Sequence, residues 1–366
     1  FFPLLFRCAG SLFLVPLVGA GSLSRPLCEC VCGMPIPRRR PREGEALPLG
    51  GCGATRETRA RTPKQTSGPL AHPPPSQPPP RHPHTDSGTF RSKPWQPLLD
   101  EAASLVASGV KELCLIAEDT NQYGSDLKAD GVSLAAMLRE LGALEGLHWI
   151  RLLYCYPSYF DEALIAEIAA NPKVCKYVDM PLQHVHNLTL LAMNRPPRAH
   201  ADGLLGRLRA GIPGLALRTT FISGFPGETE AAHRELVDFC GAFKFERMGA
   251  FAYSSEDGTP AASLPDQVHP DTRAARRDEL VSLQQDVGSA FAEGLVGTEV
   301  DVLVDGYDED GALVGRTQWD APDVDPLVFL GEPEAGSGIP AAAPGQMRRC
   351  LVTGASLFDL EATPVA

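Results

Sequence analysis

Beyond residue 90, segments with apolar residues at helical spacing alternate with short, continuously apolar segments. The expected helices are 97–108, 132–144, 161–170, 188–193, 202–210, 229–242 and 270–293, and the expected strands are 112–117, 149–155, 176–180, 215–223 and 247–253. Asp161 is expected to cap the third helix. Alternating strands and helices are typical of a parallel sheet or barrel with right-handed crossovers. The pattern therefore predicts an α/β domain over residues 91–293.

After Gly294 the hydrophobic period changes to two. Val300, Val302 and Val304 alternate with residues of the opposite face, which indicates a half-buried strand. A turn at 308–311 separates it from an expected strand at 312–316, and further strands are expected at 324–330 and 348–353. Several short strands in so short a segment predict a small all-β barrel over residues 294–366.

Residues 1–90 have a different composition. They hold 16 of the 34 prolines, and their 11 Lys and Arg against 5 Asp and Glu give a net charge of +6. A low-complexity proline tract spans 73–83, and such tracts are extended rather than packed. The chain begins with Phe1 instead of Met, which indicates a fragment or an incomplete gene model. We predict that residues 1–90 are a disordered or mistranslated leader.

Charge and hydropathy exclude several classes of protein for the rest of the chain. Residues 91–366 hold 22 Lys and Arg against 40 Asp and Glu, a net charge of −18, which disfavours a general nucleic-acid binder. No uninterrupted apolar run reaches the roughly 18 residues of a transmembrane helix, so no membrane association is expected.

The start of the chain lacks the charged residues and the cleavage site of a secretory signal, whereas an Arg-rich, acid-poor leader is also typical of organelle transit peptides. Scattered cysteines read as small buried side chains in a reducing compartment: Cys8, Cys114, Cys155, Cys175, Cys240 and Cys350. The predicted location is the cytoplasm or an organellar matrix, plastid or mitochondrial, and not the secretory route.

Polar, Gly and Pro residues follow every predicted strand of the α/β domain. They occupy 118–120, 156–157, 181–184, 224–228 and 254–255. Ligand chemistry in such folds lies at the carboxyl ends of the strands. Taken singly, each of these features also has a structural interpretation. Asp119 could cap a helix or turn, His184 could be a structural histidine, and residues 224–227 could form a tight turn. Their shared position on one rim favours a ligand site.

Five segments from Pro94 onwards resemble the RimO family of radical S-adenosylmethionine (SAM) methylthiotransferases, which is related to the MiaB transfer-RNA methylthiotransferases. They are VKELCLIAEDTNQYGSD (110–126), MPLQHVHNLTLLAMNRP (180–196), LRTTFISGFPGETE (217–230), YSSEDGTPAASLPDQV (253–268) and LVGRTQWDAPDVDPLVFL (313–330). Their order matches that of the family, and the similarity covers about three quarters of the chain.

The resemblance implies a partial (β/α) barrel followed by a five-stranded TRAM domain. It also implies two cofactors, a 4Fe-4S cluster held by three cysteines in a C-x3-C-x2-C loop and SAM, which the cluster reduces to a 5′-deoxyadenosyl radical. The product carries a methylthio group in place of an unactivated hydrogen, so sulfur and electron donors are expected partners. The cofactor carries the difficult chemistry, and the protein positions it and excludes water.

The resemblance assigns the cofactor residues by their place in the motifs. Gly224, Pro226, Gly227 and Glu228 would shape the SAM pocket, and Gln183, His184 and Asp119 would line the same rim. Arg218 would either contact the SAM carboxylate in a bidentate manner or form a structural salt bridge. Glu118 stands where the family usually has Gln, which adds a negative charge near the pocket.

The cluster loop is the main departure from the family. Cys28, Cys30 and Cys32 alternate, and clustered thiolates can bind zinc or an iron–sulfur cluster. Cys28 and Cys32 have the C-x3-C spacing and are the predicted iron ligands, but the third ligand would fall at Pro35, which cannot bind iron. Two interpretations follow. Either the first 90 residues contain a gene-model error, which we favour, or the chain is a degenerate homologue.

Charge favours one of two sister substrates. Residues 296–366 carry 13 Asp and Glu against three Arg, a net charge of −10, which would repel RNA and attract a basic small-subunit ribosomal protein. Segments 117–120 and 320–325 also resemble the protein-modifying branch. The predicted reaction is methylthiolation of an aspartate β-carbon in that protein, without direct nucleic-acid binding. The alternatives are modification of a transfer-RNA adenosine, or a catalytically inactive remnant that binds a protein partner. A lysine-dependent aldolase is disfavoured, since Lys128 alone follows a strand end.

Overall fold

The computed structural model describes residues 13–17, 90–127 and 131–366. Six strands form one sheet in the order β1–β2–β3–β4–β5–β6, and five more form a closed barrel in the order β10–β11–β9–β8–β7. The sheet strands are β1 (Phe13–Leu17), β2 (Glu112–Ile116), β3 (Trp149–Leu152), β4 (Val174–Asp179), β5 (Ala216–Ser223) and β6 (Arg247–Ala252). This order confirms the predicted partial α/β barrel followed by a small β-barrel.

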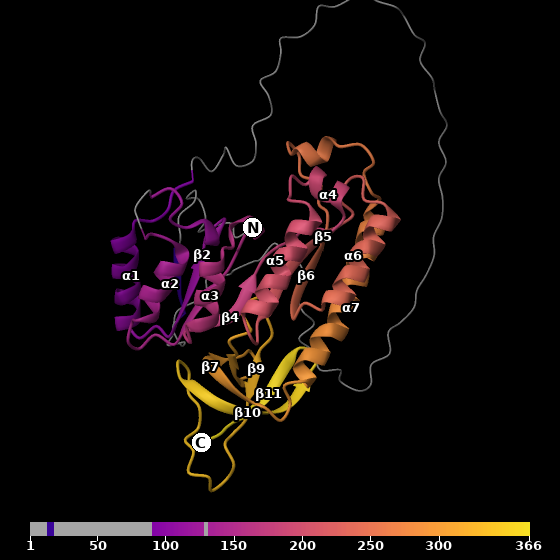
Figure 1. Cartoon of the computed structure of the whole chain (residues 1–366). Coiled ribbons are helices and arrows are strands. Elements are labelled where there is room, and N and C mark those ends of the chain that lie inside the picture. Colours follow the sequence, from indigo (N-terminus) through magenta and orange to yellow (C-terminus); the bar gives the residue numbers. More distant parts are fainter. Residues whose placement is uncertain (1–12, 18–89, 128–130) are drawn as a thin grey trace, which may run out of the picture.

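Seven α-helices accompany the sheet in the described ranges. They are α1 (Trp95–Ala107), α2 (Leu134–Gly142), α3 (Glu162–Ala170), α4 (Asn187–Ala192), α5 (Arg198–Gly211), α6 (Glu230–Phe243) and α7 (Pro270–Glu293). Most of them follow one another across one face of the sheet (Figure 1). As predicted, Asp161 caps α3, because its Oδ1 accepts a hydrogen bond from the Leu164 amide at 2.7 Å. No helix in these ranges is long and apolar enough to cross a membrane.

Strands β2 to β6 pair in parallel. All five residues of β2 are buried, as expected for a parallel strand that is covered on both faces. The main core lies between the sheet and its helices, and it includes Leu113, Ile150, Val178 and Phe221. The parallel register brings the carboxyl ends of β2 to β6 to one rim.

Strand β1 was not expected. It pairs antiparallel to β2, from Phe13 opposite Ile116 to Leu17 opposite Glu112. The strand lies in the segment predicted to be a disordered or mistranslated leader, so the parallel sheet predicted for residues 91–293 did not include it. It occupies the edge of the sheet, where Pro16 is tolerated because an edge strand needs fewer amide donors.

The β-barrel contains β7 (Glu299–Tyr307), β8 (Leu313–Arg316), β9 (Val328–Leu330), β10 (Met347–Ser356) and β11 (Asp359–Pro364). Val300, Val302 and Val352 fill its core, which confirms the period of two. The expected strand at 324–330 begins only at Val328, because the Asp325 side chain makes tertiary contacts instead. Strand β11 was missed, since Leu360 is the one large apolar residue among the three that it buries, with Ala362 and Pro364.

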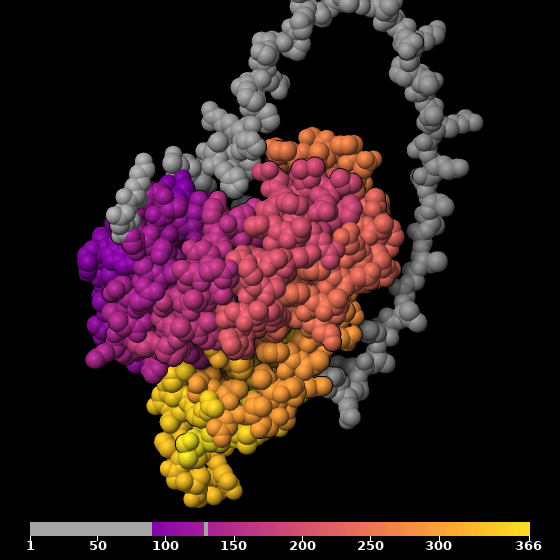
Figure 2. Space-filling model, viewed as in Figure 1, coloured from indigo at the N-terminus to yellow at the C-terminus, as the bar shows by residue number. Residues whose placement is uncertain are grey.

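The β-barrel packs beneath the amino ends of the sheet strands (Figure 1). Figure 2 shows it as an orange and yellow lobe directly against the α/β domain. At this interface the Glu112 carboxylate of β2 accepts from Arg151 Nε at 2.6 Å and from Arg316 Nη2 of β8 at 2.8 Å. All three side chains are at most 1% exposed. The rim formed by the carboxyl ends of β2 to β6 therefore lies at the opposite end of the strands from the β-barrel.

Candidate cofactor site at the rim of the sheet

The loops that follow β2, β4 and β5 bring most of the predicted site residues to the rim. Asp119 follows β2, Gln183 and His184 follow β4, and residues 224–228 follow β5. Gln183 continues the sheet through a bridge to Phe221, because its amide donates to the Thr220 carbonyl and its carbonyl accepts from Ile222, both at 2.9 Å. Its φ of 71° is unusual for a residue other than glycine, and such backbone strain often accompanies a ligand site.

The loop after β5 has a shape that glycine makes possible. Gly224 has a φ of 74°, and a Cβ at this position would come within 2.3 Å of the Arg273 side chain from α7. Gly227 has a φ of 83° and donates its amide to the Asp266 carbonyl at 3.0 Å. Pro226 is buried between them. The loop therefore exposes little besides backbone at Gly227, as a surface that approaches a ligand closely requires.

Glu228 closes this loop from within. Its Oε2 accepts from the Gly224 amide at 2.8 Å, and its Oε1 accepts from Arg276 Nη1 of α7 at 2.9 Å. His184 Nε2 lies 3.4 Å from Oε2, too poorly aligned for a hydrogen bond, and both side chains are fully buried. Burial alone would raise the pKa of Glu228, but His184, the Gly224 amide and Arg276 together hold it below its ordinary value.

His184 is oriented by its own loop. Its Nδ1 accepts a hydrogen bond from the His186 amide at 2.9 Å, so a neutral ring carries its proton on Nε2, which points toward Glu228. The pair connects the loop after β4 with the loop after β5. In this arrangement, His184 and Glu228 support the rim from behind rather than face it.

The carboxylate of Asp119 is only partly hydrogen-bonded. Its Oδ1 is buried and has no hydrogen-bond partner among the described residues. Burial raises its pKa to about 6, although the Tyr156 amide and the charge of Arg195 oppose that shift. A carboxylate that is kept at such a cost in a loop at the rim is a candidate functional group.

Asp119→Asn is expected to stabilise the fold at neutral pH. The raised pKa means that ionised Asp119 destabilises the folded state above pH 6, and that this penalty disappears below its ordinary pKa of 3.8. The shift corresponds to at most about 3 kcal/mol at pH 7.5. Urea titrations at pH 7.5 and pH 3.5 should show a gain in unfolding free energy only at the higher pH. Equal gains at both values would contradict the assignment.

Sequence reasoning missed three groups at the rim. Ser223 Oγ ends β5 and Tyr253 OH follows β6, and both are buried without a hydrogen-bond partner in the described part of the chain. Arg195 lies over the Tyr156 ring, 5.1 Å from its centroid. The position of Ser223 and Tyr253 at strand ends was the available signal. With Asp119 Oδ1, Ser223 Oγ and Tyr253 OH are thus buried polar atoms at the rim that no described residue satisfies.

Arg218 lies in the amino half of β5, away from the loops of the rim. Its Nη1 donates to Asp179 Oδ1 at 3.0 Å, and its Nε donates to Asp325 Oδ1 of the barrel domain at 3.3 Å. Burial alone would lower the pKa of its guanidinium, but these carboxylates and Tyr177 raise it well above its ordinary value. Of the two predicted alternatives, the structure contains the salt bridge.

The described residues do not fit an iron–sulfur cluster. No group of three or more His, Cys, Asp or Glu in that part of the chain could hold a metal ion. Its five cysteines are all buried, which confirms their interpretation as small core residues, and burial raises the pKa of each thiol. The predicted ligands Cys28 and Cys32, and Cys8, lie outside the described residues.

Both domains have known relatives. A TRAM domain model matches residues 296–365. The chain is 45% identical over 276 residues to the ribosomal protein uS12 methylthiotransferase RimO of Desulforudis audaxviator, covering 75% of this chain and 60% of that protein. The homologous RimO of Geobacter sulfurreducens is 44% identical over 276 residues, with the same coverage. The chain thus spans about 60% of the length of these relatives.

Two solved structures align more loosely with the fold. Coproporphyrinogen III oxidase from Escherichia coli, a radical SAM enzyme, aligns with a TM-score of 0.40 and 13% identity, covering 56% of this chain and 49% of that one. The radical SAM methyltransferase TsrM from Kitasatospora setae, which has cobalamin and a [4Fe-4S] cluster bound, aligns with a TM-score of 0.36 and 22% identity, covering 44% and 31%.

An open α/β barrel with a polar rim, joined to a TRAM barrel, defines the general class of this molecule. Within that class, the chain resembles the RimO family, because curated proteins of that name are 41–46% identical to it over most of its length.

Proposed function

We propose that this chain is the catalytic core and TRAM domain of a methylthiotransferase that acts on ribosomal protein uS12. The observation that carries the proposal is its 45% identity over 276 residues to a RimO protein of that name. We further propose that the modified atom is the β-carbon of an aspartate, and that separate proteins donate sulfur and electrons. Such a reaction belongs where ribosomes are, in the cytoplasm or an organellar matrix.

The rim is the proposed SAM site. When bound, SAM supplies a methyl group and a sulfonium whose carbon–sulfur bond can be cleaved. The chain supplies the Asp119 carboxylate and the hydroxyls of Ser223 and Tyr253. Asp119 Oδ1, Ser223 Oγ and Tyr253 OH have no hydrogen-bond partner within the described residues. Gln183 and residues 224–227 provide the surrounding backbone, while His184 and Glu228 hold it in place. Cys28 and Cys32 remain the predicted iron ligands.

The surface of the TRAM domain supports a basic protein partner. Among its carboxylates, Asp320 and Asp325 are buried and pair with Arg247 and Arg218, so they cannot attract a partner. Eight others are exposed: Glu299, Asp301, Glu309, Asp310, Asp323, Glu332, Glu334 and Glu361. Arg349 is the one exposed arginine of residues 296–366, since Arg316 is buried and Arg348 is half-buried. An acidic surface of this kind favours a basic ribosomal protein over RNA.

The experiment is anaerobic reconstitution of the whole chain with iron and sulfide, followed by incubation with SAM, dithionite and uS12. A brown protein that cleaves SAM, together with mass-spectrometric replacement of one aspartate hydrogen by CH3S, supports the proposal. Modified transfer RNA with unmodified uS12 would overturn the choice of substrate. A colourless protein that leaves SAM intact would contradict an enzymatic function of this chain.

Matched variants locate the site. Asp119→Ala is expected to weaken SAM binding by about tenfold, since a charge-assisted hydrogen bond is lost. Asp100→Ala, which removes an exposed carboxylate from α1, is the control and should bind SAM normally. Equal affinities of the two variants would remove Asp119 from the site.

A further inference from the structure

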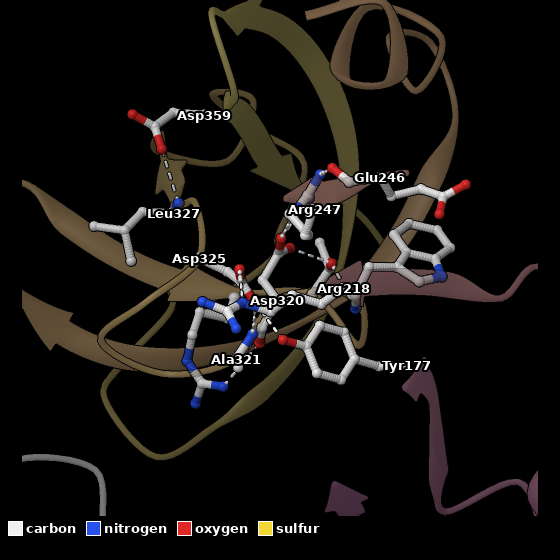
Figure 3. Close-up of polar contacts among 12 residues, drawn as sticks. Tyr177, Arg218, Glu246, Arg247, Asp320, Ala321, Asp325, Leu327 and Asp359 are labelled. Atoms are coloured by element: carbon white, nitrogen blue, oxygen red, sulfur yellow. Dashed lines mark hydrogen bonds and ion pairs between the residues drawn. The ribbon is translucent and has the colours of Figure 1, made fainter. Parts of the chain in front are cut away.

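Asp325 lies at the centre of the contact between the two domains (Figure 3). Its Oδ2 accepts from the Ala321 amide at 2.9 Å and from Tyr177 OH of β4 at 2.7 Å. Its Oδ1 accepts from Arg218 Nε of β5 at 3.3 Å. The side chain of Asp325 is only 4% exposed. The barrel backbone therefore fixes a buried carboxylate against the sheet.

Arg218 also binds a second carboxylate, that of Asp179, at the carboxyl end of β4. Arg218 Nη1 donates to Asp179 Oδ1 at 3.0 Å, and Asp179 is the last residue of β4 and also only 4% exposed. Asp325 and Asp179 thus share one guanidinium, each through a different edge. Since a guanidinium is planar and rigid, its contact with Asp325 restricts how it can face Asp179.

Asp179 in turn holds the loop that follows β3. Its Oδ2 accepts from the Tyr154 amide at 3.2 Å, and its carbonyl accepts from the Cys155 amide at 2.8 Å. Tyr154 has a φ of 56°, a conformation that its own side chain disfavours and that these contacts maintain.

The β3 loop then reaches the neighbourhood of Asp119. The Tyr154 carbonyl accepts from the Thr120 amide at 3.0 Å. Asn121 and Tyr156 exchange two hydrogen bonds, at 2.7 and 2.8 Å. Contacts thus run without a break from the barrel to Thr120, the residue next to Asp119.

We propose that Asp325 is a positioning residue, through which the barrel domain fixes the rim loop after β3 by way of Arg218 and Asp179. Movement of the barrel against the sheet would release Tyr154 and, with it, the loop that carries Asp119. This positioning role is independent of the reaction that takes place at the rim. In the acidic segment 320–325, Asp320 and Asp325 thus bind the sheet rather than a partner protein.

Asp320 provides a matched control at the same interface. It is 2% exposed, and its Oδ1 accepts from Arg247 Nε at 3.0 Å. Its Oδ2 accepts from the Thr317 hydroxyl at 2.5 Å. Neither partner contacts Asp179 in the described structure. Asp320→Asn therefore removes a buried ion pair from the same interface and leaves in place the contacts of Asp325 with Arg218 and of Arg218 with Asp179.

The test is amide hydrogen exchange of the full chain without cofactors. In Asp325→Asn, the Tyr154, Cys155 and Thr120 amides are expected to exchange about tenfold faster than in the unmodified protein, because their local opening becomes less costly. In Asp320→Asn the same amides should exchange at the original rate, although both variants lower overall stability. Unchanged exchange in Asp325→Asn, or equal acceleration in Asp320→Asn, would overturn the proposal.

Arg218→Lys tests the proposal if Asp325→Asn does not fold. The lysine keeps the positive charge, but a single ammonium cannot reproduce two contacts made by separate edges of a guanidinium. The same three amides should exchange faster in this variant, and unchanged rates there would also refute the positioning role.

Discussion

Glu112→Gln is expected to lower the free energy of unfolding at pH 7 by about 3 to 5 kcal/mol, the cost of breaking a buried ion pair from one side. The substitution preserves the shape of the side chain and removes its charge. Arg151 and Arg316 are then left with guanidinium groups whose side chains are at most 1% exposed. Arg316 retains Asp305, while Arg151 retains only backbone carbonyls of residues 317 and 318 as polar partners in the described structure.

The effect should depend on pH. Burial by itself raises the pKa of Glu112, but Arg151 and Arg316 bring it below its ordinary value of 4.5. A carboxyl group with a lowered folded-state pKa stabilises the fold above its unfolded-state pKa, and that contribution disappears as the pH falls through the folded-state value. The difference between Glu112→Gln and the unmodified protein should therefore be largest above pH 4.5 and shrink in more acidic solution.

Arg349→Gln is the control for this substitution. Arg349 also contacts two carboxylates, those of Glu299 and Asp301, but its side chain is 46% exposed. Exposed pairs contribute less than about 1 kcal/mol. Urea titrations should be followed by circular dichroism and by tryptophan fluorescence. Trp319 contributes to that signal, and its indole donates to the Gly214 carbonyl across the interface at 2.9 Å. A loss below 1 kcal/mol in Glu112→Gln would show that the ion cluster is dispensable.

The elements of the fold could be predicted because their hydrophobic periods are strong. Helix α7 has the bounds that the pattern indicated, and β2 to β6 were all found. The two missed strands failed for different reasons. Strand β11 buries few large apolar side chains, whereas β1 is apolar but lies in a proline-rich segment whose composition predicted no packed structure. Topology made the rim predictable, since parallel strands bring their carboxyl ends together.

The partners of the charged residues could not be predicted. Glu112 stands in an otherwise apolar strand, which marks it as a buried charge that needs a partner, but Arg316 is 204 residues away. Asp320 and Asp325 looked like a substrate signature and are buried at the domain interface instead. A local sequence pattern indicates which face of a strand or helix a residue occupies. The pairing of these charges depends instead on how the α/β domain and the β-barrel pack against each other.

The second large expected loss of stability concerns the loop after β5, because one buried carboxylate, that of Glu228, holds its shape. Glu228→Gln is expected to lower the free energy of unfolding at pH 7 by about 3 kcal/mol. The amide can still accept from Gly224, but it cannot balance the charge of Arg276, whose side chain is 9% exposed. Because the pKa of Glu228 lies below 4.5, its contribution is complete above that pH and declines in more acidic solution.

Glu230→Gln separates this effect from a general loss of negative charge near α7. Glu230 contacts the same Arg276, at 3.3 Å, but its side chain is 73% exposed, so its loss should cost less than about 1 kcal/mol. Thermal unfolding of both variants at pH 7 and pH 4 measures the contrast. Hydrogen exchange at the amide of Gly224 should rise only in Glu228→Gln, since this amide donates to the Glu228 carboxylate. If both variants behave alike, the loop is held by its glycine backbone and by Arg273 rather than by Glu228.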